Sequence, residues 1–158
     1  MAKIAVGKKV PAFSAPATGG TVITSKELIG EPFVLYFYPR DDTPGCTLEG
    51  EAFRDRHAKF RKLGVRVLGI SRDSLSAHEK FKAKFAFPFA LISDADETLC
   101  GLFDVIRDKN MYGKKVRGIE RSTFLFDANG TLRNEWRRVT VKGHVDDVLH
   151  AAEALEDE

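Results

Sequence analysis

The sequence has few cysteines and almost no excess of charge. Only two of its 158 residues are cysteines, Cys46 and Cys100, which are too few for a disulfide framework and fit thiols that stay reduced. The 25 basic and 23 acidic side chains leave a formal charge of +2, which is too small to create a strong field of one sign. The composition therefore excludes a secreted domain stabilised by disulfide bonds, and it gives no reason to expect a nucleic-acid partner.

Long hydrophobic runs are also missing. No window reaches about 18 uncharged apolar residues, the length of a membrane-spanning helix. Lysines 3, 8 and 9 interrupt the N-terminal segment too early for the apolar core of a signal peptide. We therefore expect a cytoplasmic protein with no membrane partner. Because no proline-rich or glycine- and serine-rich stretch divides the chain, we predict a single domain over residues 1–158.

Two apolar runs with a helical pattern between them predict a βαβ unit. Residues 33–38 and 65–70 have the continuous apolar character of strands that are buried on both faces. Between them, Phe53, His57 and Phe60 recur at helical spacing within residues 47–62. The order strand, helix, strand indicates a right-handed crossover and parallel pairing of the two strands.

The second half of the chain alternates between short helices and strands. Residues 76–79 read as a capping box that opens a helix ending near Pro88. A short strand over 89–92 then leads to a brief helix that carries Cys100 and is capped by residues 94–97. Further on, Asn129-Gly130 predicts a turn between two antiparallel strands, 122–126 and 132–139.

The chain is framed by two further elements. Apolar residues recur along one face of a closing helix over residues 145–155. Near the N-terminus, Gly19-Gly20 lies between residues 12–14 and 21–23, which predicts an additional small hairpin. The complete order is that of an α/β, thioredoxin-like fold with an N-terminal β-hairpin extension.

The loop that follows the first buried strand is the candidate chemical site. Residues 39–46 are rich in turn-forming residues and lead into a helix that starts near Cys46. A sulfur at a helix N-terminus lies near unpaired N–H groups and the positive end of the helix dipole, which favour an anionic thiolate. An inert, buried cysteine is the alternative, but such a cysteine is expected within a strand or on an apolar helix face.

The residues around Cys46 match a known pattern. Pro39, Thr43 and Cys46 have the spacing of the active-site signature of peroxiredoxins, and the run from Tyr38 to Glu49 resembles the bacterioferritin comigratory protein branch, also called peroxiredoxin Q. The resemblance extends over nearly the whole chain and includes segments 71–74, 109–114 and 118–124. It implies a peroxiredoxin fold, and an enzyme that reduces hydrogen peroxide and organic hydroperoxides as a monomer.

The resemblance also implies a role for each matching residue. Cys46 would be the peroxidatic cysteine, whose thiolate attacks a peroxide oxygen and becomes a sulfenic acid. Thr43 would turn its hydroxyl toward the sulfur and the peroxide, and Arg121 would stabilise the thiolate and the leaving oxygen. Pro39 would shield the sulfur, and Glu49 would help to hold the arginine.

The sequence departs from its relatives at the resolving cysteine. The two positions where the branch carries this second cysteine are Glu51 and Lys82 here. Cys100 is the remaining thiol, and its apolar neighbours favour an inert, buried cysteine. We therefore expect a one-cysteine cycle in which thioredoxin, a glutaredoxin or glutathione reduces the sulfenic acid. We expect no cofactor and no metal, since the four histidines and the cysteines lack the paired spacing of a zinc site.

Three alternatives stay open. Cys100 could resolve the sulfenic acid in a two-cysteine cycle, which would require local unfolding. The chain could be a thioredoxin-fold binding module that has lost catalysis, although the presence of Pro39, Thr43, Cys46 and Arg121 argues against this. A dithiol–disulfide oxidoreductase shares the fold but normally needs a C-x-x-C pair, which is missing here.

Overall fold

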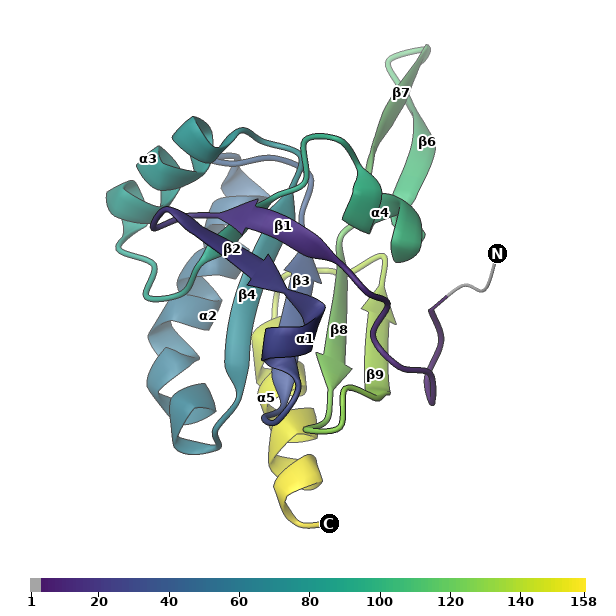
Figure 1. The fold of residues 1–158 in the computed structure, drawn as a ribbon. Helices are drawn as coiled ribbons and strands as arrows, with labels where there is room; N and C mark the ends of the chain where they lie inside the picture. Colours follow the sequence, from purple (N-terminus) through teal and green to yellow (C-terminus); the bar gives the residue numbers. More distant parts are fainter. Residues whose placement is uncertain (1–3) are drawn as a thin grey trace.

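A seven-stranded mixed sheet forms the centre of the protein, whose computed structural model describes residues 4–158 (Figure 1). In spatial order its strands are β2 (Thr21–Thr24), β1 (Ser14–Ala17), β5 (Leu91–Ser93), β4 (Arg66–Ser71), β3 (Phe33–Phe37), β8 (Ser122–Phe126) and β9 (Leu132–Arg137). The helices are α1 (Ser25–Leu28), α2 (Pro44–Lys62), α3 (Leu75–Phe85), α4 (Thr98–Leu102) and α5 (His144–Glu156). A separate two-stranded hairpin consists of β6 (Ile106–Met111) and β7 (Lys114–Ile119).

The pairing of the strands confirms the predicted topology. β3 pairs in parallel with β4, and β4 with β5, as a βαβ unit requires. β8 runs antiparallel to both β3 and β9, so the predicted second hairpin lies at one side of the sheet. At the other side β1 and β2 form the predicted N-terminal hairpin. The fold is thioredoxin-like with an N-terminal extension.

The central strand β3 separates two hydrophobic clusters. Successive side chains of a strand point to opposite faces of the sheet. Phe33, Leu35 and Phe37 accordingly belong to one cluster, and Val34 and Tyr36 to the other. The cluster of Val34 and Tyr36 also contains buried side chains from α2, α3 and α5, so these three helices cover that face. The opposite face is covered by α1 and α4, and the N-terminal hairpin contributes buried side chains to the cluster there.

The starts of α2 and α3 are set by their N-cap residues. α2 begins at Pro44, near the predicted start at Cys46, because Thr43 takes the N-cap position and proline suits the first helical turn. α3 begins at Leu75, because the hydroxyl of Ser74 caps it by accepting a hydrogen bond from the backbone N–H of Ala77 at 3.2 Å. The predicted capping box at residues 76–79 is therefore wrong. Glu79 instead accepts from the N–H of Gly19, at 2.9 Å.

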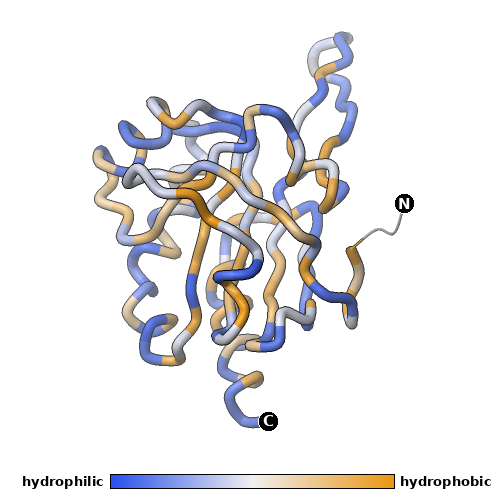
Figure 2. Tube along the Cα trace, in the orientation of Figure 1, coloured by the Kyte–Doolittle hydropathy of each residue, from blue (hydrophilic) through white to orange (hydrophobic). Residues whose placement is uncertain are grey.

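The β6–β7 hairpin projects from the body of the protein and was not predicted (Figure 1). Its turn is formed by Tyr112 and Gly113, which both have positive φ angles, of 53° and 79°. This is the backbone preference of a tight two-residue hairpin turn. The hairpin is largely hydrophilic (Figure 2), so its strands lack the apolar alternation by which strands are recognised.

Candidate active site

Cys46 lies in the first turn of α2, at the end of the loop that follows β3. Thr43 is the N-cap of this helix, Pro44 occupies its first turn, and the N–H of Thr47 donates to the carbonyl of Thr43 at 2.8 Å. The side chain of Cys46 is only 2% exposed. The fold therefore holds the sulfur at a helix N-terminus, where an anion is stabilised, and shields it from water.

Arg121 connects the sulfur with Glu49. It directly precedes β8, whose first residue Ser122 pairs with Phe37 at the end of β3, and this register brings Arg121 next to the start of α2. Its Nη2 donates to Cys46 Sγ at 3.4 Å, and its Nη1 donates to Glu49 Oε1 at 2.6 Å. A planar guanidinium with two donors can make both contacts at once, which an ammonium group cannot do with the same geometry.

Gly45 leaves the space that the guanidinium needs. A Cβ atom at this position would lie 3.0 Å from Arg121 Nη2. That separation is tighter than an ordinary van der Waals contact, so any larger residue would push the arginine away from the sulfur. The Pro-Gly pair before Cys46, which the sequence presented as a turn, thus also permits the arginine to approach.

Glu49 is a buried carboxylic acid with an unusual titration. Burial raises its pKa to about 7, because the loss of solvation outweighs the opposing effect of Arg121. Its second oxygen, Oε2, has no hydrogen-bond partner among the described residues, and neither has the hydroxyl of Tyr36. Burial raises the pKa of Tyr36 as well, and the negative charge of Glu49 adds to this shift. The interior behind the sulfur is therefore poorly solvated.

Arg121 keeps its positive charge despite its partial burial. Burial lowers the pKa of Arg121, but Glu49 and Cys46 outweigh that effect, so that its pKa is raised. The guanidinium therefore stays protonated and supplies a permanent positive charge beside the sulfur. Pro39 and Arg121 both line a cleft of about 520 Å³ that opens next to this site.

Thr43 lies in the loop but turns its hydroxyl to the backbone. Its Oγ1 donates to the carbonyl of Arg40 at 2.9 Å. This bond uses the hydroxyl hydrogen and leaves the oxygen lone pairs free to accept a bond.

A buried network that sequence reasoning missed fastens the same loop to α3. Asp41 Oδ2 lies 2.6 Å from Nδ1 of His78, and the hydroxyl of Tyr38 donates to Asp41 Oδ1, also at 2.6 Å. The other ring nitrogen of His78 lies 2.9 Å from the carbonyl oxygen of Ile92, and the backbone N–H of Asp41 donates to Asp73. The histidine side chain is fully buried. No local motif signals the pair, because its members are 37 positions apart.

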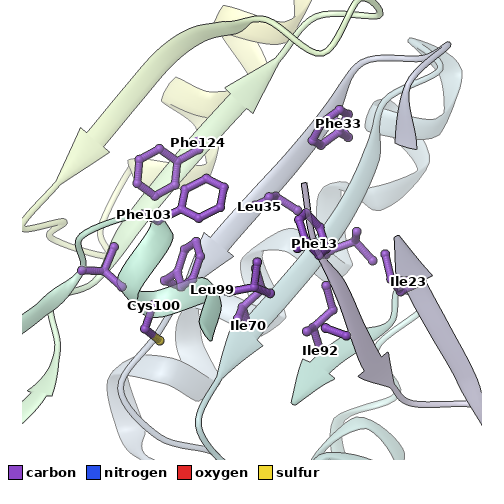
Figure 3. Close-up of a cluster of buried hydrophobic side chains, with 14 of the residues drawn as sticks. Phe13, Ile23, Phe33, Leu35, Ile70, Ile92, Leu99, Cys100, Phe103 and Phe124 are labelled. Atoms are coloured by element: carbon purple, nitrogen blue, oxygen red, sulfur yellow. The ribbon is translucent and has the colours of Figure 1, made fainter. Parts of the chain in front are cut away.

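Cys100 belongs to the other side of the sheet. It lies on α4 beside Leu99 and Phe103 (Figure 3) and is part of the cluster that contains Leu35, whereas Cys46 is part of the cluster that contains Tyr36. Burial raises the pKa of the Cys100 thiol, and Asp94 adds to this effect. Asp94 also accepts the N–H groups of Leu99 and Cys100, so it caps α4.

The two positions where relatives carry a resolving cysteine have structural contacts. Lys82 lies on α3, and its Nζ donates to the carbonyls of Phe87 and Phe89 at 2.9 and 3.1 Å. Glu51 lies on α2 and forms an ion pair with Arg54 at 3.7 Å. Within residues 4–158 no group of three or more histidine, cysteine, aspartate or glutamate side chains is arranged to hold a metal ion. None of the described helices is long and apolar enough to cross a membrane.

A thioredoxin-like fold that holds a cysteine at a helix N-terminus beside an arginine defines the peroxiredoxin class of thiol peroxidases. The comparisons with known proteins agree. The model of the AhpC/TSA family matches residues 6–135. The chain therefore belongs to the AhpC/TSA family, and it is a thiol-dependent peroxidase.

Individual relatives support the same assignment. Peroxiredoxin Bcp of Xanthomonas campestris is 53% identical over 137 residues, covering 87% of this chain and 86% of the relative. Peroxiredoxin Bcp of Bacillus subtilis is 42% identical over 154 residues, covering 98% of both. The structure is similar to that of a cysteine-to-serine mutant of PrxQ from Xylella fastidiosa, with a TM-score of 0.92, 39% identity and 98% coverage of each chain.

A second solved structure belongs to a relative whose activity was studied. It is the bacterioferritin comigratory protein of Xanthomonas campestris, which was studied for its alkyl peroxide reduction activity. The similarity has a TM-score of 0.87 and 49% identity, and it covers 91% of this chain and 92% of that one.

Proposed function

We propose that the protein reduces hydrogen peroxide and organic hydroperoxides through a one-cysteine cycle, with a thiol from solution as the reductant. It would act as a cytoplasmic monomer formed by a single domain. The alkyl peroxide reduction activity of the Xanthomonas campestris relative supports organic hydroperoxides as substrates. The low number of cysteines supports a reducing compartment.

The first half of the cycle is oxidation of Cys46. Its thiolate attacks one oxygen of the hydroperoxide, so that an S–O bond forms while the O–O bond breaks. The leaving oxygen takes up a proton and departs as water or an alcohol, and Cys46 becomes a sulfenic acid. Arg121, whose Nη2 lies 3.4 Å from Sγ, stabilises the thiolate and the charge that develops on the leaving oxygen.

The other residues of the signature position these reactants. Glu49 holds Arg121 in place through the 2.6 Å hydrogen bond. Pro39 narrows the approach to the sulfur from the side of the cleft. The lone pairs of the Thr43 hydroxyl are available to accept a hydrogen bond from the peroxide and so to orient the oxygen under attack.

The separation of the two thiols is the observation that carries the one-cysteine proposal. Cys46 and Cys100 belong to hydrophobic clusters on opposite faces of the sheet. A disulfide needs the two Cα atoms within about 7 Å of each other. In the folded structure the sheet lies between the two clusters, so a Cys46–Cys100 disulfide would require local unfolding around one of the thiols. The reducing thiol must then come from outside the protein.

The test combines mass spectrometry with two cysteine variants. After one equivalent of hydrogen peroxide we expect the intact mass to increase by one oxygen, and non-reducing peptide mapping to find the oxygen on Cys46. Cys46→Ser should have no peroxidase activity, whereas Cys100→Ser should keep most of it with a small thiol as the reductant. The two variants are matched, because each replaces one buried sulfur by oxygen.

Other outcomes would favour the alternatives. A dominant Cys46–Cys100 disulfide, together with loss of turnover in Cys100→Ser, would establish the two-cysteine cycle. A folded wild-type protein that leaves hydroperoxide unconsumed in the presence of thioredoxin, glutaredoxin and glutathione would indicate a binding module that has lost catalysis.

A further inference from the structure

The cleft beside the active site is lined by more positive than negative charge. Its walls are formed by Pro39, by the base of the β6–β7 hairpin, by Glu120 and Arg121 after the hairpin, and by residues 138–139 after β9. Four of the lining side chains are basic and two are acidic. The volume of about 520 Å³ lies within the range of sites for small molecules.

Two of the four basic side chains remain unneutralised. Arg107 is paired with Asp104 at 3.2 Å and lies 3.9 Å from Glu120, while Arg121 is paired with Glu49. Lys109 and Arg138 are both exposed, and within residues 4–158 neither takes part in an ion pair. Asp108 is the second acidic side chain of the lining, so the cleft offers two cations without an ion-pair partner and one carboxylate close to the arginine that contacts the reactive sulfur.

The reaction with hydrogen peroxide does not require the two cations. Hydrogen peroxide is small and uncharged, and its reaction requires only the groups in contact with the sulfur. The reductant, by contrast, must bring a thiol to Cys46 from solution, and a carboxylate on the same molecule would be attracted by cations at the rim of the cleft. Cys46 does not itself line the cleft, but Arg121 does, and its Nη2 lies 3.4 Å from Cys46 Sγ, so a single side chain links the cleft with the sulfur.

We propose that Lys109 and Arg138 form a carboxylate subsite that holds a small anionic thiol, of the chemical class of glutathione, while it reduces Cys46. This inference rests on the one-cysteine cycle proposed above. The bound thiol attacks the sulfur of the sulfenic acid, an S–S bond forms, and the S–O bond breaks. The hydroxyl leaves as water with the proton of the thiol. A second thiol attacks the mixed disulfide, which releases Cys46 and a disulfide of the two thiols.

The test compares two thiols of nearly the same size and shape, of which only one carries a carboxylate. N-acetylcysteine carries a carboxylate, and N-acetylcysteine amide does not. The rate constant for reduction of the Cys46 sulfenic acid is measured with each thiol at low and at high salt. Each rate constant is corrected for the fraction of the reagent that is present as thiolate. The quantity compared is the ratio of the rate constant for N-acetylcysteine to that for its amide. The variants are Lys109→Gln, Arg138→Gln and the double variant. Lys115→Gln is the control, because it removes a charge from the same hairpin outside the cleft.

We expect the wild type to prefer the carboxylate thiol at low salt and to lose this preference at high salt. Each single variant should lower the ratio by about fivefold, the effect of one unit charge at about 4 Å in water. The double variant should abolish the preference, and the control should retain it. An identical ratio in the wild type and the double variant would overturn the proposal, as would a wild type that is reduced by a protein thiol only.

Two further arms separate the possible failures. A carboxylate-bearing alkyl hydroperoxide and its methyl ester are compared in the oxidation step, and a charge preference found there instead of in the reduction step would reassign the subsite to the peroxide. The oxidation of Cys46 is followed by intact mass in every sample. If Cys46 gains no oxygen, or forms a disulfide with Cys100, the proposed one-cysteine cycle has failed. If oxidation is normal but no carboxylate preference exists, only the subsite has failed.

Discussion

Replacing Glu49 by glutamine should change how the stability of the protein depends on pH. In the folded protein, burial raises the pKa of Glu49 to about 7, above the ordinary value of 4.5. Between these two values the folded protein keeps the proton on Glu49 while the unfolded chain has released it. Because the folded state binds more protons in this interval, the free energy of unfolding falls as the pH rises.

The expected magnitude follows from the size of this interval. About 2.5 pH units, at about 1.36 kcal/mol for each unit, correspond to about 3 kcal/mol lost between pH 4.5 and pH 7. Glutamine has nearly the same shape, and its carbonyl oxygen can still accept the hydrogen bond from Arg121, but it does not titrate. Glu49→Gln should therefore lack this part of the decline while the rest of its pH dependence stays the same.

The measurement is urea denaturation of the reduced protein at several pH values between 4.5 and 8, followed by the fluorescence of the single tryptophan. Glu51→Gln is the control, since Glu51 lies on the same helix and its side chain is 33% exposed. The quantity to compare is the change in unfolding free energy between pH 4.5 and 8. If Glu49→Gln declines as much as the wild type does, burial of this carboxyl does not govern its titration and the reasoning is refuted.

Three further results are expected. Burial lowers the pKa of His144 to about 4, so the free energy of unfolding should fall by about 3 kcal/mol as the pH drops from 6.5 to 4. His144→Gln should remove this loss. Denaturation curves in which the variant loses as much stability as the wild type between pH 6.5 and 4 would contradict this prediction. A Cβ at Gly50 would lie 2.4 Å from the ring of Phe87, so Gly50→Ala should cost about 1–3 kcal/mol. Thermal melts should show this loss in contrast to Gly101→Ala, where the added Cβ meets nothing within 4 Å. Arg121→Lys keeps the charge but cannot contact the Glu49 carboxylate and the Cys46 sulfur at once. The rate constant for oxidation of Cys46 by peroxide, measured by stopped flow, should therefore fall by at least about tenfold. A variant that is oxidised at the wild-type rate would exclude a role for the bridge.

The elements that could be predicted are those with a strong internal pattern. The βαβ unit was predicted from the continuous apolar run before Pro39 and from the helical spacing of Phe53 and Phe60. A strand buried on both faces gives a continuous apolar run, and a helix buried on one face gives apolar residues at helical spacing. The β6–β7 hairpin leaves no such trace, since its strands are exposed and charged. Ser74 was missed as the cap of α3 because Ser76 and Glu79 also have the spacing of a capping box.

The candidate site was predictable to different degrees. The helix N-terminus pointed to Cys46 from local sequence alone, whereas the roles of Thr43, Glu49 and Arg121 came from resemblance to a family. The link between Asp41 and His78 could not be predicted, since it depends on how a loop and a distant helix meet in space. Local patterns report what a segment prefers, and contacts of this kind arise only when the whole sheet is assembled.

In the proposed one-cysteine cycle, the sheet that separates the two thiols also determines how long an oxidised molecule remains oxidised. A cysteine placed next to the sulfenic acid would capture it in an internal step whose rate does not depend on concentration. With Cys100 on the far face, each molecule must wait for an encounter with a thiol from solution. During that wait a second hydroperoxide can convert the sulfenic acid to a sulfinic acid, which is not readily reversed. The ratio of thiol to peroxide around the protein thus sets how many turnovers each copy completes in its lifetime.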